Sequence, residues 1–344
     1  MIIWIQRYLF VFLLSLSTAL IFTPLVRRIA LRFGVLDEPN ERKIHTHPIP
    51  LWGGLAVYFA YAFSISLTFY YTNPLKSIVF GGLIVLLLGL VDDAKPVPAA
   101  IKLIILLGLT FWLSRYGIVI KLSGIPIIDI SVTILWIVGI TSAFNVIDNM
   151  DGLASGIAAI VSLMFFIVAL ASYQWWFGLL ACALLGATLG FLPYNFHPAK
   201  IFIGNGGSMF LGFTLGTIAV MGEWSPNRFI AFTIPVLILA IPIFDIIYVM
   251  TLRYKQGLTP TLREIIIYCG KDHLSHRLME LGFKQRGVVI LLYLLSLCLG
   301  LGAIMLKVEV TEYDATILII QALLIILIIG VLLNIKTNNH NLVK

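Results

Sequence analysis

The stretch LASGIAAIVSLMFFIVALAS, from Leu153 to Ser172, carries no charged side chain. A helix of about 20 apolar residues is long enough to cross the hydrocarbon core of a bilayer. Ten further apolar runs accompany it, several of them short or interrupted by Gly and Pro, so the count could be ten in all. The sequence therefore predicts an all-α polytopic membrane protein, folded as a single domain over 1–344, with about ten or eleven transmembrane helices. The expected spans are 5–24, 51–71, 77–91, 98–114, 131–147, 153–172, 175–192, 207–222, 228–250, 287–306 and 315–335.

The composition of the whole chain excludes most other classes of protein. Of its 344 residues 60% are apolar and 11% are charged, and the mean hydropathy is +1.03, whereas soluble domains are about 25% charged. A single soluble domain of this length cannot bury so much apolar surface. Three Cys residues, an odd number, argue against a disulfide-bonded scaffold, and the scarcity of charge argues against disorder.

The placement of Lys and Arg predicts the orientation in the membrane. Of the 23 basic residues, 17 fall in or beside the connections 25–50, 92–97, 148–152, 193–206 and 251–286 and the C-terminal tail. The alternate connections hold the other six: Arg7, Lys76, Arg115, Lys121, Arg228 and Lys307. The positive-inside rule then places the first set in the cytoplasm, with the N-terminus outside and the C-terminus inside, as in a multi-pass protein of the inner membrane. The net charge of +7 thus reflects topology, and no nucleic acid is expected as a partner.

Two weaker patterns complete the outline of the fold. Residues 118–129 alternate around Gly124-Ile125-Pro126, which predicts a small extracytoplasmic β-hairpin. No internal repeat is evident, and this disfavours the inverted-repeat architecture of a transporter.

Acidic side chains gather at the predicted cytoplasmic ends of the spans. Asp92 and Asp93 end the third span, where adjacent carboxylates suit a divalent cation or a shared proton, although they could simply terminate the helix. Asp148 and Asp151 follow the fifth span three residues apart, close to Asn145. Asp151 could merely cap the next helix, but one cap does not require so many polar residues.

Three further segments on this face could bind a phosphorylated substrate. The glycine-rich segment that ends in Ser208 could leave backbone N–H groups open to a phosphate, or could serve close helix packing. His273, His276 and Arg277 would share one helical face and could grip phosphates within the cytoplasmic loop 251–286. The basic stretch with Lys43 and His45 could bind substrate, or could only set topology or touch anionic lipid.

Five segments together, in this order, resemble the polyprenyl-phosphate N-acetylhexosamine-1-phosphate transferases: Arg42-Lys43-x-His45 with Pro-Ile-Pro and Gly53-Gly54, Asp92-Asp93, Asn145 to Gly156, Asn195 to Ser208, and His273 to Arg277. The resemblance implies that a polyprenyl (undecaprenyl) phosphate in the bilayer attacks the β-phosphorus of a UDP-N-acetylhexosamine. UMP leaves, and a polyprenyl-diphospho-sugar forms for cell-wall or surface-glycan synthesis. The family uses Mg²⁺, with Mn²⁺ as an alternative, and a homodimer is among the assemblies that the resemblance allows.

The resemblance also assigns roles by position. It places Asp92, Asp93 and Asp148 with the loop residues in a catalytic set: Asp92, Asp93, Asp148, His273, His276 and Arg277. It implies a substrate-binding set, with Asp151 and Asn195 in the uridine pocket and Phe202 stacked on uracil: Lys43, His45, Asn145, Asp151, Asn195, Phe202, Gly206 and Ser208. The implied metal ligands are Asp92, Asp148 and Asn205.

Two positions depart from the family pattern. Asn205 stands where relatives usually have a metal-binding Asp, so it can offer a carbonyl oxygen but no charge. Ser275 stands where many relatives have a third His.

Three alternative functions stay open at this point. A phospho-N-acetylmuramoyl-pentapeptide transferase is disfavoured, because such enzymes carry a run of His that is broken here at Leu274 and Ser275. A membrane transporter would place its charges near the midplane rather than at one face. A catalytically impaired binding homologue is suggested by Asn205.

Overall fold

The computed structural model describes residues 2–39, 45–68, 73–257, 272–307, 313–314, 316–325, 327 and 330. In chain order the elements are α1 (Ile2–Phe33), β1 (Leu36–Asp37), β2 (Ile49–Pro50), α2 (Gly53–Thr68), α3 (Asn73–Ala94), α4 (Ala99–Ser114), α5 (Pro126–Ile147), α6 (Leu153–Ala171), α7 (Trp175–Asn195), α8 (Gly204–Met221), α9 (Arg228–Ile238), α10 (Ala240–Lys255), α12 (Leu274–Glu280) and α13 (Gln285–Met305). A further short apolar helix covers Thr316–Ile325.

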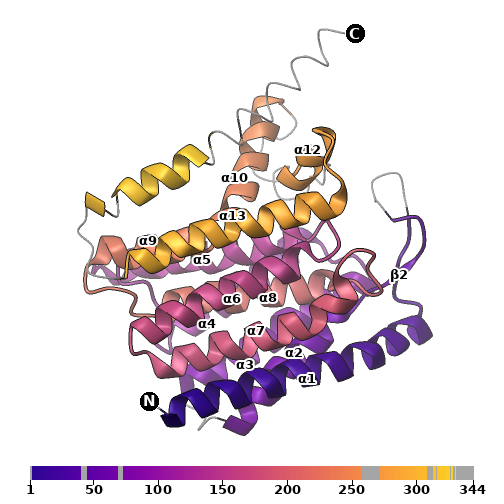
Figure 1. Ribbon diagram of the computed structural model, residues 1–344, viewed down its shortest axis with the longest axis horizontal. Helices are drawn as coiled ribbons and strands as arrows, with labels where there is room; N and C mark the ends of the chain where they lie inside the picture. The colour runs from indigo at the N-terminus through magenta and orange to yellow at the C-terminus, as the bar shows by residue number, and fades with distance from the viewer. Residues whose placement is uncertain are drawn as a thin grey trace.

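The helices lie side by side in a bundle, as Figure 1 shows. Helix α8 is buried along nearly its whole length and packs against α2, α3 and α5. On the other side of the bundle α1 packs against α7, α7 against α6, and α6 against α13. Helix α8 is apolar all round, as expected for a helix in the interior of a bundle.

The predicted all-α membrane fold is confirmed, but fewer helices are long enough to span than the ten or eleven expected. Within the described part of the chain, six are long and apolar enough to cross a membrane: α1, α3, α5, α6, α7 and α13. The run expected as one span over 228–250 is the pair α9 and α10, bent by 78°. Pro242 lies in the first turn of α10 and has no N–H for the carbonyl of Ile238, so the helix cannot continue through this point.

Glycine contacts bring α2 and α3 onto the N-terminal end of α8. A Cβ atom on Gly54 would lie 2.2 Å from the Cα of Gly207, and one on Gly89 would lie 2.3 Å from the Cα of Gly206. Backbones this close leave no room for any side chain between the helices. The contacts fix the end of α3 against the start of α8.

The hairpin expected over residues 118–129 is corrected by the structure, because residues 118–125 contain no strand. The Asp129 carboxylate, in the first turn of α5, accepts the N–H groups of Leu122 (3.2 Å), Ser123 (2.8 Å) and Gly124 (3.1 Å). Because these N–H groups bond to Asp129, they cannot pair with a neighbouring strand. The paired strands of the described residues lie elsewhere: β1 and β2 are antiparallel, with Leu36 opposite Pro50.

Candidate active site

Polar side chains from the ends of three helices meet at one end of the bundle. The Asn205 side-chain amide, in the first turn of α8, donates to Asp92 Oδ2 on α3 (2.9 Å). The backbone N–H of Asn205 donates to Asp93 Oδ1 (2.8 Å). One turn further along α8, the Ser208 hydroxyl donates to Asn145 Oδ1 on α5 (2.9 Å). Segments far apart in the sequence, all singled out there, are thus brought together.

Both carboxylate oxygens of Asp92 are occupied by the protein itself. Oδ1 accepts the Val97 N–H (2.8 Å), and Oδ2 accepts the Lys102 ammonium (2.9 Å) as well as the Asn205 amide. The Asp92 side chain is 7% exposed. Asp92 therefore ties the ends of α3 and α8 to the start of α4, and its charge is already balanced by Lys102.

Asp93 sits at the N-terminus of α8, where the helix dipole favours a negative charge. It accepts the N–H groups of Asn205 (2.8 Å) and Gly206 (3.5 Å). Gly204 has φ +74°, and a Cβ atom there would lie 2.4 Å from Asp93 Oδ2. Of the two interpretations of this glycine-rich segment, the structure favours close packing, because Asp93 already holds the N–H groups that a phosphate would need. Gly206 and Ser208 are both buried.

Asp148 differs from its neighbours in having no partner. It follows the last residue of α5, and it forms no hydrogen bond or ion pair with any residue that the structure describes. Burial, and then the charges of Asp93, Asp37 and Asp151, raise the pKa of Asp148 well above its usual range. Asp148 is therefore a carboxyl group among other acids, and no cation of the described residues compensates its charge.

The donor set around Asp148 fits Mg²⁺ in part. Within the described residues no three His, Cys, Asp or Glu side chains are grouped as a complete metal site. No cation of the described residues pairs with Asp148, however, and the side-chain oxygen Oδ1 of Asn205 accepts no hydrogen bond from those residues. Mg²⁺ in proteins is usually held by one or two carboxylates and completed by water and substrate phosphates. These oxygens suit such an arrangement.

Asp151 and Asn195 hold a turn beside this cluster. Asp151 Oδ2 lies 2.8 Å from His197 Nδ1 and accepts the Ala199 N–H (3.1 Å). The buried Asn195 accepts the Ser155 hydroxyl (2.6 Å) and donates to the Ile201 carbonyl (3.1 Å). These contacts shape the segment that leads into Phe202, so both side chains serve the site at least as positioning groups.

Phe202 and His45 lie together next to the strands. Their ring centroids are 5.4 Å apart in an edge-on arrangement, and both side chains are half-buried. His45 Nε2 lies 2.9 Å from Asp37 Oδ2. The Phe202 N–H donates to the Pro50 carbonyl, and the Phe202 carbonyl accepts the Gly53 N–H. These two bonds hold the ring at the N-terminus of α2. Lys43 falls outside the described residues.

The histidine segment is anchored to α10 and reaches the end of α5. His273 Nδ1 lies 3.1 Å from Asp245 Oδ2, and the other oxygen of Asp245 accepts the Leu274 N–H (2.7 Å). The Ser275 hydroxyl donates to Asn149 Oδ1 (2.7 Å), the residue next to Asp148. Ser275, the second departure from the family pattern, is thus the contact that joins this segment to α5.

Charged side chains in and beside this segment form ion pairs: Asp272 with Arg253, and Arg277 with Glu280 (3.4 Å). Asp272, just before His273, forms a buried ion pair with Arg253 on α10, with contacts of 2.5 and 2.7 Å. Burial opposes ionisation of Asp272, but hydrogen bonding to Arg253 and its charge lower the pKa of this carboxyl below its usual value. His276 and Arg277 are half-buried, and the buried Nε of Arg277 has no partner among the described residues.

Several partners in this site were not selected from the sequence. Lys102, Asp37, His197 and Asn149 each bind a predicted site residue. Asn149 and His197 lie inside the quoted segments, so their position in the chain was a usable signal. Lys102 lies within an apolar span, where an ionisable residue is itself a signal.

Comparison with known proteins gives consistent matches. Residues 75–223 match the model of glycosyl transferase family 4. A probable undecaprenyl-phosphate N-acetylglucosaminyl 1-phosphate transferase of Bacillus subtilis (strain 168) is 34% identical, with 88% of this chain and 85% of the relative covered. A decaprenyl-phosphate N-acetylglucosaminephosphotransferase of Mycolicibacterium smegmatis is 30% identical, with 81% and 77% covered. An undecaprenyl-phosphate alpha-N-acetylglucosaminyl 1-phosphate transferase of Escherichia coli (strain K12) is 27% identical, with 84% and 83% covered.

Proposed function

The chain belongs to glycosyl transferase family 4 and is a membrane sugar-phosphate transferase, and from this premise we propose that it transfers N-acetylglucosamine 1-phosphate from a UDP-sugar to a polyprenyl phosphate. A lipid phosphate oxygen bonds to the β-phosphorus of the UDP-sugar. The bond from that phosphorus to the bridging oxygen breaks, and UMP leaves with the electron pair. The product is a polyprenyl-diphospho-sugar, the lipid-linked start of a cell-wall or surface glycan.

The observation that carries the proposal is the contact between Ser275 and Asn149. This contact supports a position of the histidine segment, which carries His273, His276 and Arg277, next to Asp148 and the acids at the ends of α3 and α5. Phosphoryl transfer requires alignment of two oxygens and neutralisation of the phosphate charge more than covalent chemistry by the protein. A site that joins a carboxylate without a counter-charge to a basic loop meets these requirements.

We assign the Mg²⁺ site to the carboxylate of Asp148 and the side-chain carbonyl oxygen Oδ1 of Asn205. When bound, Mg²⁺ supplies charge that stabilises the diphosphate as the bond to UMP breaks. The resemblance implies Asp92 as a metal ligand, but its carboxylate is already paired with Lys102. We therefore propose that Asp92 orients the side chain of Asn205, whose amide donates to it. Asp93 holds the first turn of α8 in place behind Asn205.

The basic loop binds the diphosphate of the donor. Arg277 offers its unpartnered Nε–H, and a guanidinium can form two parallel bonds to a phosphate. Asp245 holds the ring of His273 through Nδ1, which leaves Nε2 to face the substrate. No general base is needed for the attack, because a phosphate monoester has its second pKa near 6 and is largely a dianion at neutral pH.

The remaining predicted residues surround the nucleotide. The half-buried ring of Phe202 can stack on uracil, with His45 at its edge. Asp151 and Asn195 fix the turn that presents this ring. Asn145 is held by Ser208 and lies on the α5 side of the same site.

The cellular setting is part of the proposal. The charge distribution supports an active site on the cytoplasmic face of the inner membrane, with the N-terminus outside. A single domain and a homodimer are the simplest arrangement that we propose for the assembled enzyme.

The test is a direct assay of UMP release. Purified full-length protein with polyprenyl phosphate, Mg²⁺ and UDP-N-acetylglucosamine should release UMP and form a lipid-linked sugar. A panel that includes UDP-N-acetylmuramoyl-pentapeptide tests the alternative substrate. The absence of UMP with every UDP-N-acetylhexosamine would overturn the proposal, and solute uptake in proteoliposomes would favour a transporter.

A further inference from the structure

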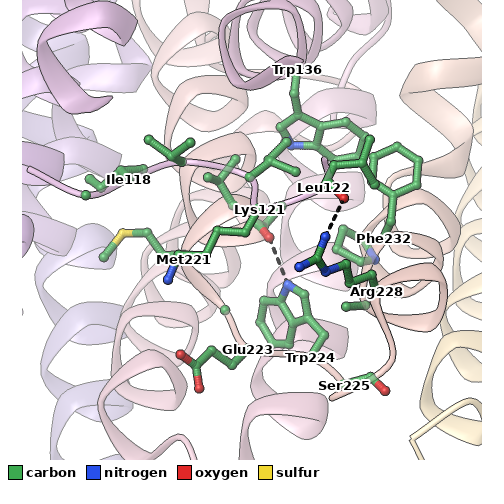
Figure 2. Close-up of a pocket in the computed structure, with 18 of the residues that line it drawn as sticks. Ile118, Lys121, Leu122, Trp136, Met221, Glu223, Trp224, Ser225, Arg228 and Phe232 are labelled. Atoms are coloured by element: carbon green, nitrogen blue, oxygen red, sulfur yellow. Dashed lines mark hydrogen bonds between the residues drawn. The ribbon is translucent and has the colours of Figure 1, made fainter. Parts of the chain in front are cut away.

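A cavity of about 760 Å³, whose lining Figure 2 shows, lies at the C-terminal end of α8, and the catalytic cluster lies at the N-terminal end of the same helix. Residues 116–122, the C-terminal end of α8 with the turn that follows, the first half of α9, and Lys307 after α13 line it. Helix α8 has 18 residues and carries Asn205 at its other end. At a rise of 1.5 Å per residue, the helix separates the two sites by about 25 Å. The cavity is therefore no part of the catalytic cluster.

The walls of this cavity are fixed by hydrogen bonds within the protein. Asp129 holds the three consecutive N–H groups that begin at Leu122, and Thr133 accepts the N–H of Ile120 (2.9 Å). On the opposite wall the Trp224 indole donates to the Ala219 carbonyl (2.8 Å). The cavity is thus formed in the protein alone, as ligand sites usually are.

Three cations are among the residues that line the cavity. Half of the six basic residues of the sparsely charged connections line it: Lys121, Arg228 and Lys307. Arg228 donates to the Leu122 carbonyl (3.1 Å), and Lys307 donates to the Trp224 carbonyl (3.0 Å). None of the three forms an ion pair with a carboxylate of the described residues. Glu223 is the one acid among the lining residues, and in Figure 2 its carboxylate points away from Arg228.

Much of the rest of the lining is apolar. Ile118, Met221 and the rings of Trp136 and Phe232 face the same space, as the labelled side chains in Figure 2 show. A cavity of 300–1,000 Å³ with an apolar wall and a few charged groups is typical of a site for an amphipathic ligand. It lies beside the N-terminal end of α5, a helix long and apolar enough to cross the membrane, and this position suits the level of the lipid headgroups.

We infer that this cavity binds the phosphate-bearing headgroup of a lipid, with Arg228, Lys121 and Lys307 around the phosphate and the first part of an acyl or prenyl chain against Trp136 and Phe232. The three lining cations pair with no carboxylate of the described residues, and this favours an anionic ligand. The aromatic wall favours a ligand with an apolar tail. The ligand enters from the leaflet opposite to the catalytic cluster, so this site is separate from the substrate site of the proposed reaction.

The experiment is native mass spectrometry of the full-length protein with four probes: an anionic glycerophospholipid, a zwitterionic phospholipid, a polyprenyl phosphate and inorganic phosphate. Two cavity variants are compared with the wild type. The first is the double variant Arg228→Gln and Lys307→Gln, and the second is Ala231→Trp, which fills the cavity but keeps the cations. Arg7→Gln is the matched control, because Arg7 is an exposed Arg at the same end of the bundle and outside the cavity. Two contacts place Arg7 at this end of the bundle. Trp4, one turn before Arg7, stacks on Trp175, and the adjacent Gln174 forms hydrogen bonds with the backbone of Glu223 beside the cavity.

The wild type should retain a phospholipid or polyprenyl phosphate, with about fivefold weaker binding for each cation removed. Ala231→Trp should lose the lipid as well, while Arg7→Gln binds as the wild type does, and the melting temperature without lipid checks that every variant is folded. Preference among the lipids then identifies the source of the headgroup. Equal binding by inorganic phosphate, or lipid binding that is unchanged in both cavity variants, would overturn the inference.

Discussion

The two ends of helix α8 show opposite solutions to the placement of charge beside a membrane. At its N-terminal end, acids outnumber cations, the glycine contacts leave little space, and nearly every polar group has a partner within the protein. At its C-terminal end, cations surround an open cavity and bond only to backbone carbonyls. The first end is prepared for a metal ion and a charged reaction, and the second for an anionic ligand. Among the described residues, Asp148 pairs with no cation at one end and the three cations pair with no carboxylate at the other, and these uncompensated charges indicate what each end binds.

The largest effect is expected for Asp148→Asn at the acidic end. Loss of this carboxylate should lower the rate of UMP release by about 100- to 1,000-fold, as removal of one charge-stabilising group in an active site does. The same variant should melt at a higher temperature in chelator, because ionisation of Asp148 among other acids destabilises the fold. Ser142→Asn, on a half-buried position of the same helix, is the matched control.

The pH dependence of that stability has a definite sign. Because the pKa of Asp148 is raised in the folded protein, the folded state holds a proton that the unfolded chain releases near pH 4. The contribution of Asp148 to the free energy of unfolding is therefore complete below the unfolded pKa and is lost as pH rises through the folded pKa. Thermal melts in chelator should show a larger fall in wild type than in Asp148→Asn. A variant that melts lower than wild type at neutral pH would contradict the assignment.

A smaller effect is expected for Asp245→Asn, which keeps the acceptor for Leu274 N–H but removes the charge opposite His273. Residues that orient a catalytic His contribute about 10- to 100-fold. The loss should appear in kcat and in its pH profile, with little change in KM. A variant whose pH profile matches wild type while only its stability falls would show that Asp245 is structural.

The reverse effect is expected for Asn205→Asp, which adds charge to the acidic end. The Mg²⁺ concentration for half-maximal rate should fall by about tenfold, since ligand charge largely sets affinity for hard cations. Without metal the variant should be less stable, because its second carboxylate replaces an amide donor to Asp92. Asn205→Ala is the control, and equal Mg²⁺ dependence of the two variants would remove Asn205 from the metal site.

The smallest effect on activity is expected at the basic end. Asp129→Ala frees the loop that carries Lys121, so the melting temperature should fall by roughly 2–4 °C. UMP release should stay within about twofold of wild type, because α8 separates this loop from the acids by about 25 Å. A large loss of activity without unfolding would couple the two ends and break the comparison between them.

The sequence predicts features that depend on local pattern. Apolar runs locate α3, α5, α6 and α7 because the period and length of such runs are local properties. The bend between α9 and α10 and the loop held by Asp129 were not foreseen. Both depend on which backbone groups find partners, and the weak alternation of residues 118–129 carries no information about the carboxylate at its end.

The same limit applies to the candidate site. Asp92, Asp93, Asn145 and Asn205 could be named because polar residues at the ends of apolar spans are conspicuous. Their division of roles could not be predicted, since it depends on the Lys102 ammonium and on N–H groups of a helix more than a hundred residues away. The glycine-rich segment illustrates this most clearly, because its backbone donors bind Asp93.

The glycine contacts of α8 also set an order of assembly during synthesis. The ribosome makes α2, α3 and α5 before residues 204–208. Until α8 is made, Asp93 and Asn145 therefore lack the hydrogen-bond donors that α8 supplies. Because Gly206 and Gly207 pack backbone against backbone, α8 can enter only a slot that α2 and α3 have left open between them. The acidic part of the site is therefore complete only when α8 has been made, and the histidine segment, which follows α8 in the chain, joins it later still.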